Sequence, residues 1–91
     1  MITLKSAHEI ELMRRAGKIT AAARAVARDM VKPGVTTQQI DKAVHKFITE
    51  QGAIPSFLHY NGYPASVCVS VYDEIIHGIP GKRVLQEGDI V

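Results

Sequence analysis

The strongest constraint on this chain is a change in the spacing of its apolar residues at Gly52. Before Gly52 they recur every three or four positions, and after it they alternate with small polar residues between turn-forming ones. A spacing of three to four is typical of a helix that is buried on one side, and a spacing of two is typical of a strand. The sequence therefore predicts helices first, followed by short strands and loops.

The first helix is predicted over Ser6–Val31, a stretch without proline. Ser6, with Glu9 three residues later, has the form of a capping box. Seven alanines in this stretch favour helix. Apolar residues at helical spacing form one face: Leu12, Ala16, Ile19, Ala23, Val26 and Met30. Pro33 and Gly34 are expected to end the helix.

A second helix is predicted from Thr36 to Gly52, which we expect to be its C-terminal cap. Its apolar residues follow the i, i+3, i+4, i+7, i+8 spacing of an amphipathic helix: Ile40, Ala43, Val44, Phe47 and Ile48.

Two short strands are predicted after the helices. Ser66–Val71 alternates small polar residues with valine, and Ile75–His77 follows it, with two isoleucines expected to enter a core. Glu87–Asp89 is expected to be a turn before Ile90 and Val91, which have the character of a strand beginning. A sheet edge of this kind is normally covered, so we expect residues 1–91 to be the N-terminal part of a longer protein.

Composition excludes several classes of protein. Ninety-one residues allow one domain at most, and a single Cys excludes a disulfide framework and a cysteine-based zinc site. No apolar run has the length of a membrane span or a signal peptide, so a reducing cytosolic location is expected.

The net charge of +2 is uneven, because residues 1–50 hold nine Lys or Arg against five Asp or Glu. This imbalance raises the alternative of a nucleic-acid-binding module. A recognition helix would need a basic exposed face, and the second helix offers only Lys42, Lys46 and two Gln. Direct nucleic-acid recognition is therefore not favoured.

The histidines and acids form no local metal-binding pattern such as HExxH. His8 and His45 are expected at ordinary surface positions, and His59 in a packing or surface role. Asp73 and Glu74 are expected to be solvated turn residues.

Three kinds of residue after Gly52 are candidates for function. His77 is one, because an imidazole where the chain turns at Gly78 can exchange a proton near neutral pH. Cys68 is compatible with a small core residue. Tyr60 and Tyr63 either pack against the turn or form the wall of a pocket for an apolar side chain.

Five segments together resemble the type I methionine aminopeptidases, and they extend over nearly the whole chain: Ile10–Gly17, Val31–Thr37, Tyr60–Val71, Asp73–Pro80 and Leu85–Val91. The resemblance implies an α/β fold of the α+β kind, the pita-bread fold, in which two amphipathic helices are followed by antiparallel strands. Residues 1–91 would be the N-terminal fragment of that single catalytic domain.

The resemblance also implies an activity, which is removal of the initiator Met from nascent proteins by metal-activated water. Two divalent metal ions are expected per complete enzyme, held by ligands beyond Val91. Asp89 belongs to the turn and is not expected to be a ligand, so the fragment alone should be inactive. The implied partner is the N-terminal Met of nascent proteins, with the ribosome as a further candidate. A monomer is expected for the complete protein, without membrane contact.

Residue by residue, His77 matches the family histidine that hydrogen-bonds the substrate near the scissile amide and stabilises the transition state. The positions that match the pocket for the Met side chain are Phe57, Tyr60, Tyr63 and Cys68. Two residues depart from the family pattern, since Tyr72 stands where Asn is common and His59 where Gly is common. The alternative function is a non-catalytic pita-bread relative that acts as a binding module.

Overall fold

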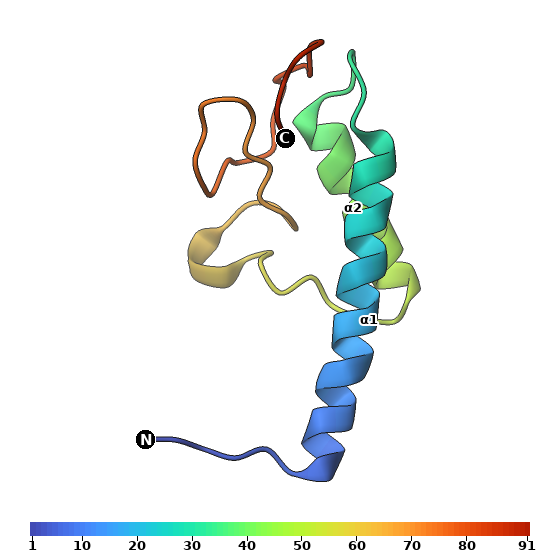
Figure 1. Ribbon diagram of the computed structural model, residues 1–91, viewed down its shortest axis with the longest axis vertical. Coiled ribbons are helices and arrows are strands. Elements are labelled where there is room, and N and C mark those ends of the chain that lie inside the picture. The colour runs from blue at the N-terminus through green and yellow to red at the C-terminus, as the bar shows by residue number, and fades with distance from the viewer.

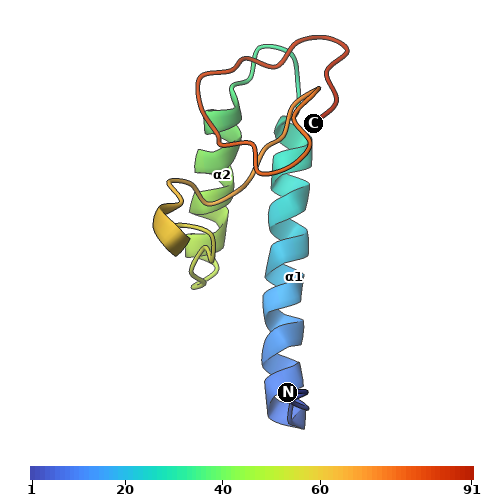
Figure 2. The same ribbon diagram turned by 90° about the vertical axis from the view of Figure 1, so that its left-hand side faces the viewer.

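The computed structural model describes all of Met1–Val91 as two α-helices followed by a long irregular segment (Figure 1). Helix α1 spans Ala7–Met30, helix α2 spans Thr37–Glu50, and one short 3₁₀ turn, η1, spans Tyr60–Gly62. The two helices lie side by side, and the orange and red C-terminal segment lies over the end where α1 finishes and α2 begins (Figure 2). Neither helix combines the length and the apolarity that a membrane crossing needs.

Both helices start at capping boxes, of which the sequence predicts the first. Ser6 Oγ accepts a hydrogen bond from the Glu9 amide at 3.1 Å, and the Glu9 carboxylate accepts one from the Ser6 amide at 2.9 Å. Thr36 and Gln39 form the same reciprocal pair at the start of α2, at 3.1 and 2.8 Å. These bonds satisfy amides that the first helical turn leaves without a partner.

The end of α2 is also as predicted. Gly52 adopts a positive φ of 75°, a conformation that costs glycine little. Its amide donates to the Thr49 carbonyl at 3.0 Å, and the Ala53 amide donates to the Ile48 carbonyl at 3.2 Å. This pair of bonds is a Schellman motif, which closes the helix and turns the chain away from it.

The predicted strand at Ser66–Val71 does not form. Four of its amides bond to three separate residues: Ser66 and Val67 to Asp41, Val69 to Gly78, and Val71 to Glu74. A strand needs successive bonds to one neighbour, and the chain forms only an isolated antiparallel bridge, between Thr36 and Val84. The predicted burial of the valine face is nevertheless confirmed, because Val69 and Val71 are buried.

The second predicted strand, Ile75–His77, is also absent, and its expected burial is wrong. Ile75 is 95% exposed and Ile76 is 70% exposed. No backbone bond joins this stretch to a neighbouring segment, so nothing within residues 1–91 covers the two side chains. The structure therefore supports a helical class for these residues, and the antiparallel strands expected for an α+β fold are not present in them.

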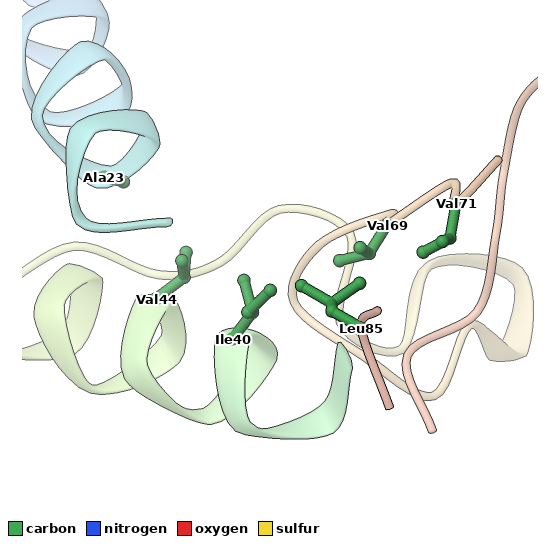
Figure 3. Close-up of a cluster of buried hydrophobic side chains, with 6 residues drawn as sticks. All are labelled: Ala23, Ile40, Val44, Val69, Val71 and Leu85. Atoms are coloured by element: carbon green, nitrogen blue, oxygen red, sulfur yellow. The ribbon is translucent and has the colours of Figure 1, made fainter. Parts of the chain in front are cut away.

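The apolar core lies between the facing sides of α1, α2 and the C-terminal segment. It consists of six buried side chains, Ala23, Ile40, Val44, Val69, Val71 and Leu85. Ile40 and Val44 project from the same side of α2, and Leu85 and Val69 lie next to Ile40 (Figure 3). Burial of apolar surface there joins three parts of the chain that are distant in sequence.

The core is small for a chain of this length. The radius of gyration of the whole chain is 15.0 Å, whereas a compact domain of the same size would have about 12 Å. The first half of α1 projects beyond the other elements (Figures 1 and 2), so that Ile10, Leu12 and Met13 are exposed. Much of the apolar stripe predicted for α1 is therefore not buried within these residues.

The core predicts a contrast between two isoleucines. Ile40 is 2% exposed and Ile75 is 95% exposed. Truncating a buried isoleucine leaves a cavity, so Ile40→Ala should lower the free energy of unfolding by about 2–5 kcal/mol. Ile75→Ala should change it by less than about 0.5 kcal/mol. Urea denaturation of both variants tests this expectation, and an equal loss in the two variants would contradict the placement of the core.

Candidate functional site

The five predicted site residues all lie after α2, in the segment that contains η1 and then returns to the helices. Phe57 and Tyr63 flank η1, and their rings meet edge to face with centroids 6.4 Å apart and planes at 84°. Such edge-to-face geometry is favourable for aromatic pairs. Tyr60, inside η1, is 71% exposed and takes no part in this pair.

Tyr63 connects the aromatic pair to the residues that follow it. Its hydroxyl donates a hydrogen bond to the Val67 carbonyl at 2.9 Å. Burial raises the pKa of Tyr63 to about 12, and interaction with Cys68 and the negative charge of Asp41 add to this effect. The phenol therefore remains a neutral donor at physiological pH.

Phe57 and Cys68 share a large apolar cavity between the helices and the C-terminal segment. The cavity has a volume of about 930 Å³, and 15 of its 22 lining residues are hydrophobic. Ile19 and Ala23 of α1 line it along with Phe57 and Cys68. Tyr60, Tyr63 and His77 are not among the lining residues, so the cavity brings together two of the five predicted site residues.

His77 is placed by the glycine that follows it. A Cβ atom on Gly78 would overlap the Val69 carbonyl group, so only glycine fits at this crossing. The Gly78 amide donates to Ser70 Oγ at 3.1 Å, and the Gly78 carbonyl accepts from the Val69 amide at 2.8 Å. These contacts hold the backbone beside His77, while its imidazole stays exposed.

His77 also has a positive φ of 58°. Residues other than glycine adopt this left-handed conformation at a cost, and such residues cluster at functional sites. The two departures from the family pattern have the same backbone: His59 at φ 68° and Tyr72 at φ 58°. Gly and Asn, the residues we expect to be common in the family at these positions, are the ones that tolerate it best.

A row of polar residues on α2 was missed by the sequence analysis. Thr37, Asp41 and His45 stand four residues apart, on one face of the helix, and each bonds to a distant segment. The Thr37 hydroxyl accepts a bond from the Gly81 amide at 2.8 Å. The row could have been predicted from the sequence, because its polar residues recur at i, i+4 and i+8 beside the apolar stripe.

Three further expectations are tested by the structure. His8 is exposed as predicted, but His45 is half-buried, with Nδ1 2.8 Å from Ser66 Oγ, so its predicted surface position is wrong. Glu74 is exposed, yet its carboxylate accepts from the Val71 amide at 3.1 Å. Asp89 belongs to the predicted turn, where it accepts from the Gln86 amide at 2.8 Å.

The described residues do not fit a metal site, because no three His, Cys, Asp or Glu side chains come close enough to share an ion. Binding of a divalent ion by protein oxygen and nitrogen ligands needs several converging groups.

Comparison with known proteins gives the family. The profile of metallopeptidase family M24 matches residues 11–91. The chain is a member of this family. The resemblance to methionine aminopeptidases is confirmed along the whole chain. The chain is 48% identical to methionine aminopeptidase 1 of Bacillus subtilis over 91 residues, which are 100% of this chain and 37% of that protein. It is 55% identical over 82 residues to methionine aminopeptidase 1D of Arabidopsis thaliana, covering 90% of this chain and 23% of that protein.

Solved structures agree with these matches. The chain superimposes on the methionine aminopeptidases of Rickettsia prowazekii and Thermotoga maritima, each with a TM-score of 0.94, at 40% and 39% identity. Each superposition covers 98% of this chain and 36% of the other. This M24 chain thus spans 36–37% of the length of the bacterial relatives and 23% of the plant relative.

The left-handed backbone at Tyr72 leads to a stability prediction. Tyr72→Asn should raise the free energy of unfolding by about 1 kcal/mol, because Asn adopts a positive φ at lower cost. Tyr60→Asn is the matched control, since Tyr60 is 71% exposed and Tyr72 is 70% exposed, and only Tyr72 has a positive φ. Thermal unfolding of the two variants measures the difference. A lower midpoint for Tyr72→Asn than for the unmodified protein would contradict the expected backbone strain at Tyr72.

The raised pKa of Tyr63 predicts a loss of stability at alkaline pH. The folded pKa of about 12 exceeds the ordinary value of 10.0, so the contribution of Tyr63 is fully present below pH 10 and is lost as pH rises toward 12. Urea unfolding at pH 9 and pH 11 should show a smaller alkaline loss for Tyr63→Phe than for the unmodified protein. Tyr60→Phe serves as the control, and identical losses in all three proteins would contradict the pKa shift.

Proposed function

We propose that residues 1–91 are the N-terminal part of a single pita-bread catalytic domain, in a methionine aminopeptidase that removes the initiator Met from nascent proteins. The observation that carries the proposal is the superposition at a TM-score of 0.94 over 98% of the chain on a methionine aminopeptidase, at 40% identity. Likeness of fold alone does not imply activity, but high identity along the whole chain supports a shared function.

The antiparallel sheet belongs to the same proposal. Val69 and Val71 are buried with half-buried Ser70 between them, and Ser66–Val71 lacks a continuous neighbour within residues 1–91. A neighbouring strand from the remainder of the protein would complete the ladder and give the α+β class.

We infer the roles of the site residues from the family resemblance. His77 hydrogen-bonds the substrate beside the scissile amide, from a backbone held by Gly78. Phe57, Tyr60, Tyr63 and Cys68 surround the Met side chain, for which aromatic faces and a sulfur neighbour are suitable contacts. Their placement on loops held by helices is common for binding residues.

The catalytic metal belongs to the complete enzyme. We infer two divalent ions, held by side chains outside residues 1–91, which when bound lower the pKa of a water and polarise the scissile carbonyl. Residues 1–91 by themselves would neither bind these ions tightly nor release Met. Their own contribution is to bind the N-terminal side chain and to orient the amide.

The remaining features of the proposal follow from the substrate. Nascent proteins begin with Met in the cytoplasm, so we infer that the protein acts there and meets its substrate at the ribosome. We also infer that the complete protein is a monomer. It would need neither a membrane nor direct recognition of nucleic acid. If the full-length protein bound Met-peptides without cleaving them, the alternative of a non-catalytic binding module would hold instead.

The test is substitution of His77 in the full-length protein. Loss of one preorganised hydrogen-bond donor costs about 100- to 1,000-fold in turnover, so His77→Ala should lower kcat for release of Met from a peptide by that factor. Metal content and melting temperature should stay near those of the unmodified protein, because no metal bond is removed. Loss of metal with retained folding would show that His77 is a ligand, and near-normal turnover would show that it has no catalytic role.

A further inference from the structure

Asp41 joins helix α2 to the segment that carries the proposed pocket residues. Its Oδ1 atom accepts hydrogen bonds from the backbone amides of Ser66 at 2.7 Å and Val67 at 3.1 Å. Both bonds are part-buried and bridge 25 and 26 residues of sequence. Bonds from amides to a charged carboxylate are short and strong, so they hold the backbone of Ser66 and Val67 at a defined place on α2.

Val67 is held at both of its backbone polar groups. Its amide donates to Asp41 at 3.1 Å, and its carbonyl accepts from the Tyr63 hydroxyl at 2.9 Å. Tyr63 in turn packs edge to face on Phe57. A continuous series of contacts therefore runs from α2 to two of the proposed pocket residues, and a third, Cys68, directly follows Val67.

His45 supports the same segment one helical turn after Asp41. Its Nδ1 atom lies 2.8 Å from Ser66 Oγ. His45 thus contacts the side chain of Ser66, while Asp41 holds the backbone of the same residue. Because Ser66 is buried and His45 half-buried, water competes little with either contact.

From these contacts we propose that Asp41 is a positioning residue for the pocket that receives the N-terminal side chain of the substrate. It acts through Val67 and sets the positions of Cys68 and Tyr63. The fit of an unbranched apolar side chain such as that of Met then depends on this carboxylate. The inference rests on the proposed function, which assigns Cys68 and Tyr63 to the pocket.

The test uses alkylation of Cys68 in the full-length protein, measured by mass spectrometry of the peptide that contains it. L-Methionine is the probe, and the concentration that halves the alkylation rate measures how well the pocket binds it. Asp41→Ala removes the acceptor of both amides and should raise this concentration about ten-fold. Asp41→Asn keeps an uncharged oxygen acceptor and should raise it less.

Asp29→Ala is the matched control, because the Asp29 carboxylate is exposed and bonds only to Arg28 on the surface. Its half-protecting concentration should equal that of the unmodified protein. An unchanged value in Asp41→Ala, with the helical circular dichroism retained, would overturn the positioning role. If Asp41→Ala does not fold, Asp41→Asn decides by the same criterion. Absence of protection by L-methionine in the unmodified protein would overturn the proposed pocket itself, so the two failures are distinguishable.

Discussion

The polar face of α2 anchors two of the loop segments around the candidate site. Thr37 exchanges two hydrogen bonds with Gly81, at 2.8 and 3.2 Å, and Asp41 accepts two from Ser66 and Val67. Buried backbone groups outside helices and strands need partners of this kind. Bonds to a charged group contribute about 1.5–3 kcal/mol each, which makes Asp41 a strong attachment point for a segment without a sheet of its own.

The apolar face of the same helix supplies the second attachment. Ile40 and Val44 are buried against Val69 and Leu85 (Figure 3), so one helix presents a polar row to the backbones of the loops and an apolar row to their side chains. The Gly34 amide also donates to the Leu85 carbonyl at 2.9 Å, and the Leu85 amide donates to Val35 at 2.8 Å. The turn between α1 and α2 is thereby joined to the end of the chain.

This arrangement tolerates backbone strain near the site. His77 keeps a positive φ while Gly78 is fixed against Val69 and Ser70, and the surrounding contacts supply the energy that the strained conformation costs. His59 and Tyr72 share that conformation in exposed turns. Two of these three positions, His59 and Tyr72, are the ones at which we expect this M24 chain to depart from the methionine aminopeptidase pattern.

The helices of this protein are determined by its sequence alone. Ser6 with Glu9, Thr36 with Gln39, and Gly52 act on neighbours within a few residues, so local pattern is sufficient to place both helices. Tyr63 and Cys68 were identified through the family resemblance, and their contacts through Val67 were not visible in the sequence.

The course of the chain after Gly52 is decided by tertiary structure. Ser66–Val71 has the composition of a strand, but a strand exists only where a neighbour accepts its bonds in succession. Here the amides of Ser66 and Val67 are taken by Asp41 instead. The burial of side chains is decided in the same way, by the segments that lie near them, which is why Ile75 is exposed and His45 is half-buried. A pattern of residues indicates which groups need a partner, and only the folded chain determines which partner is within reach.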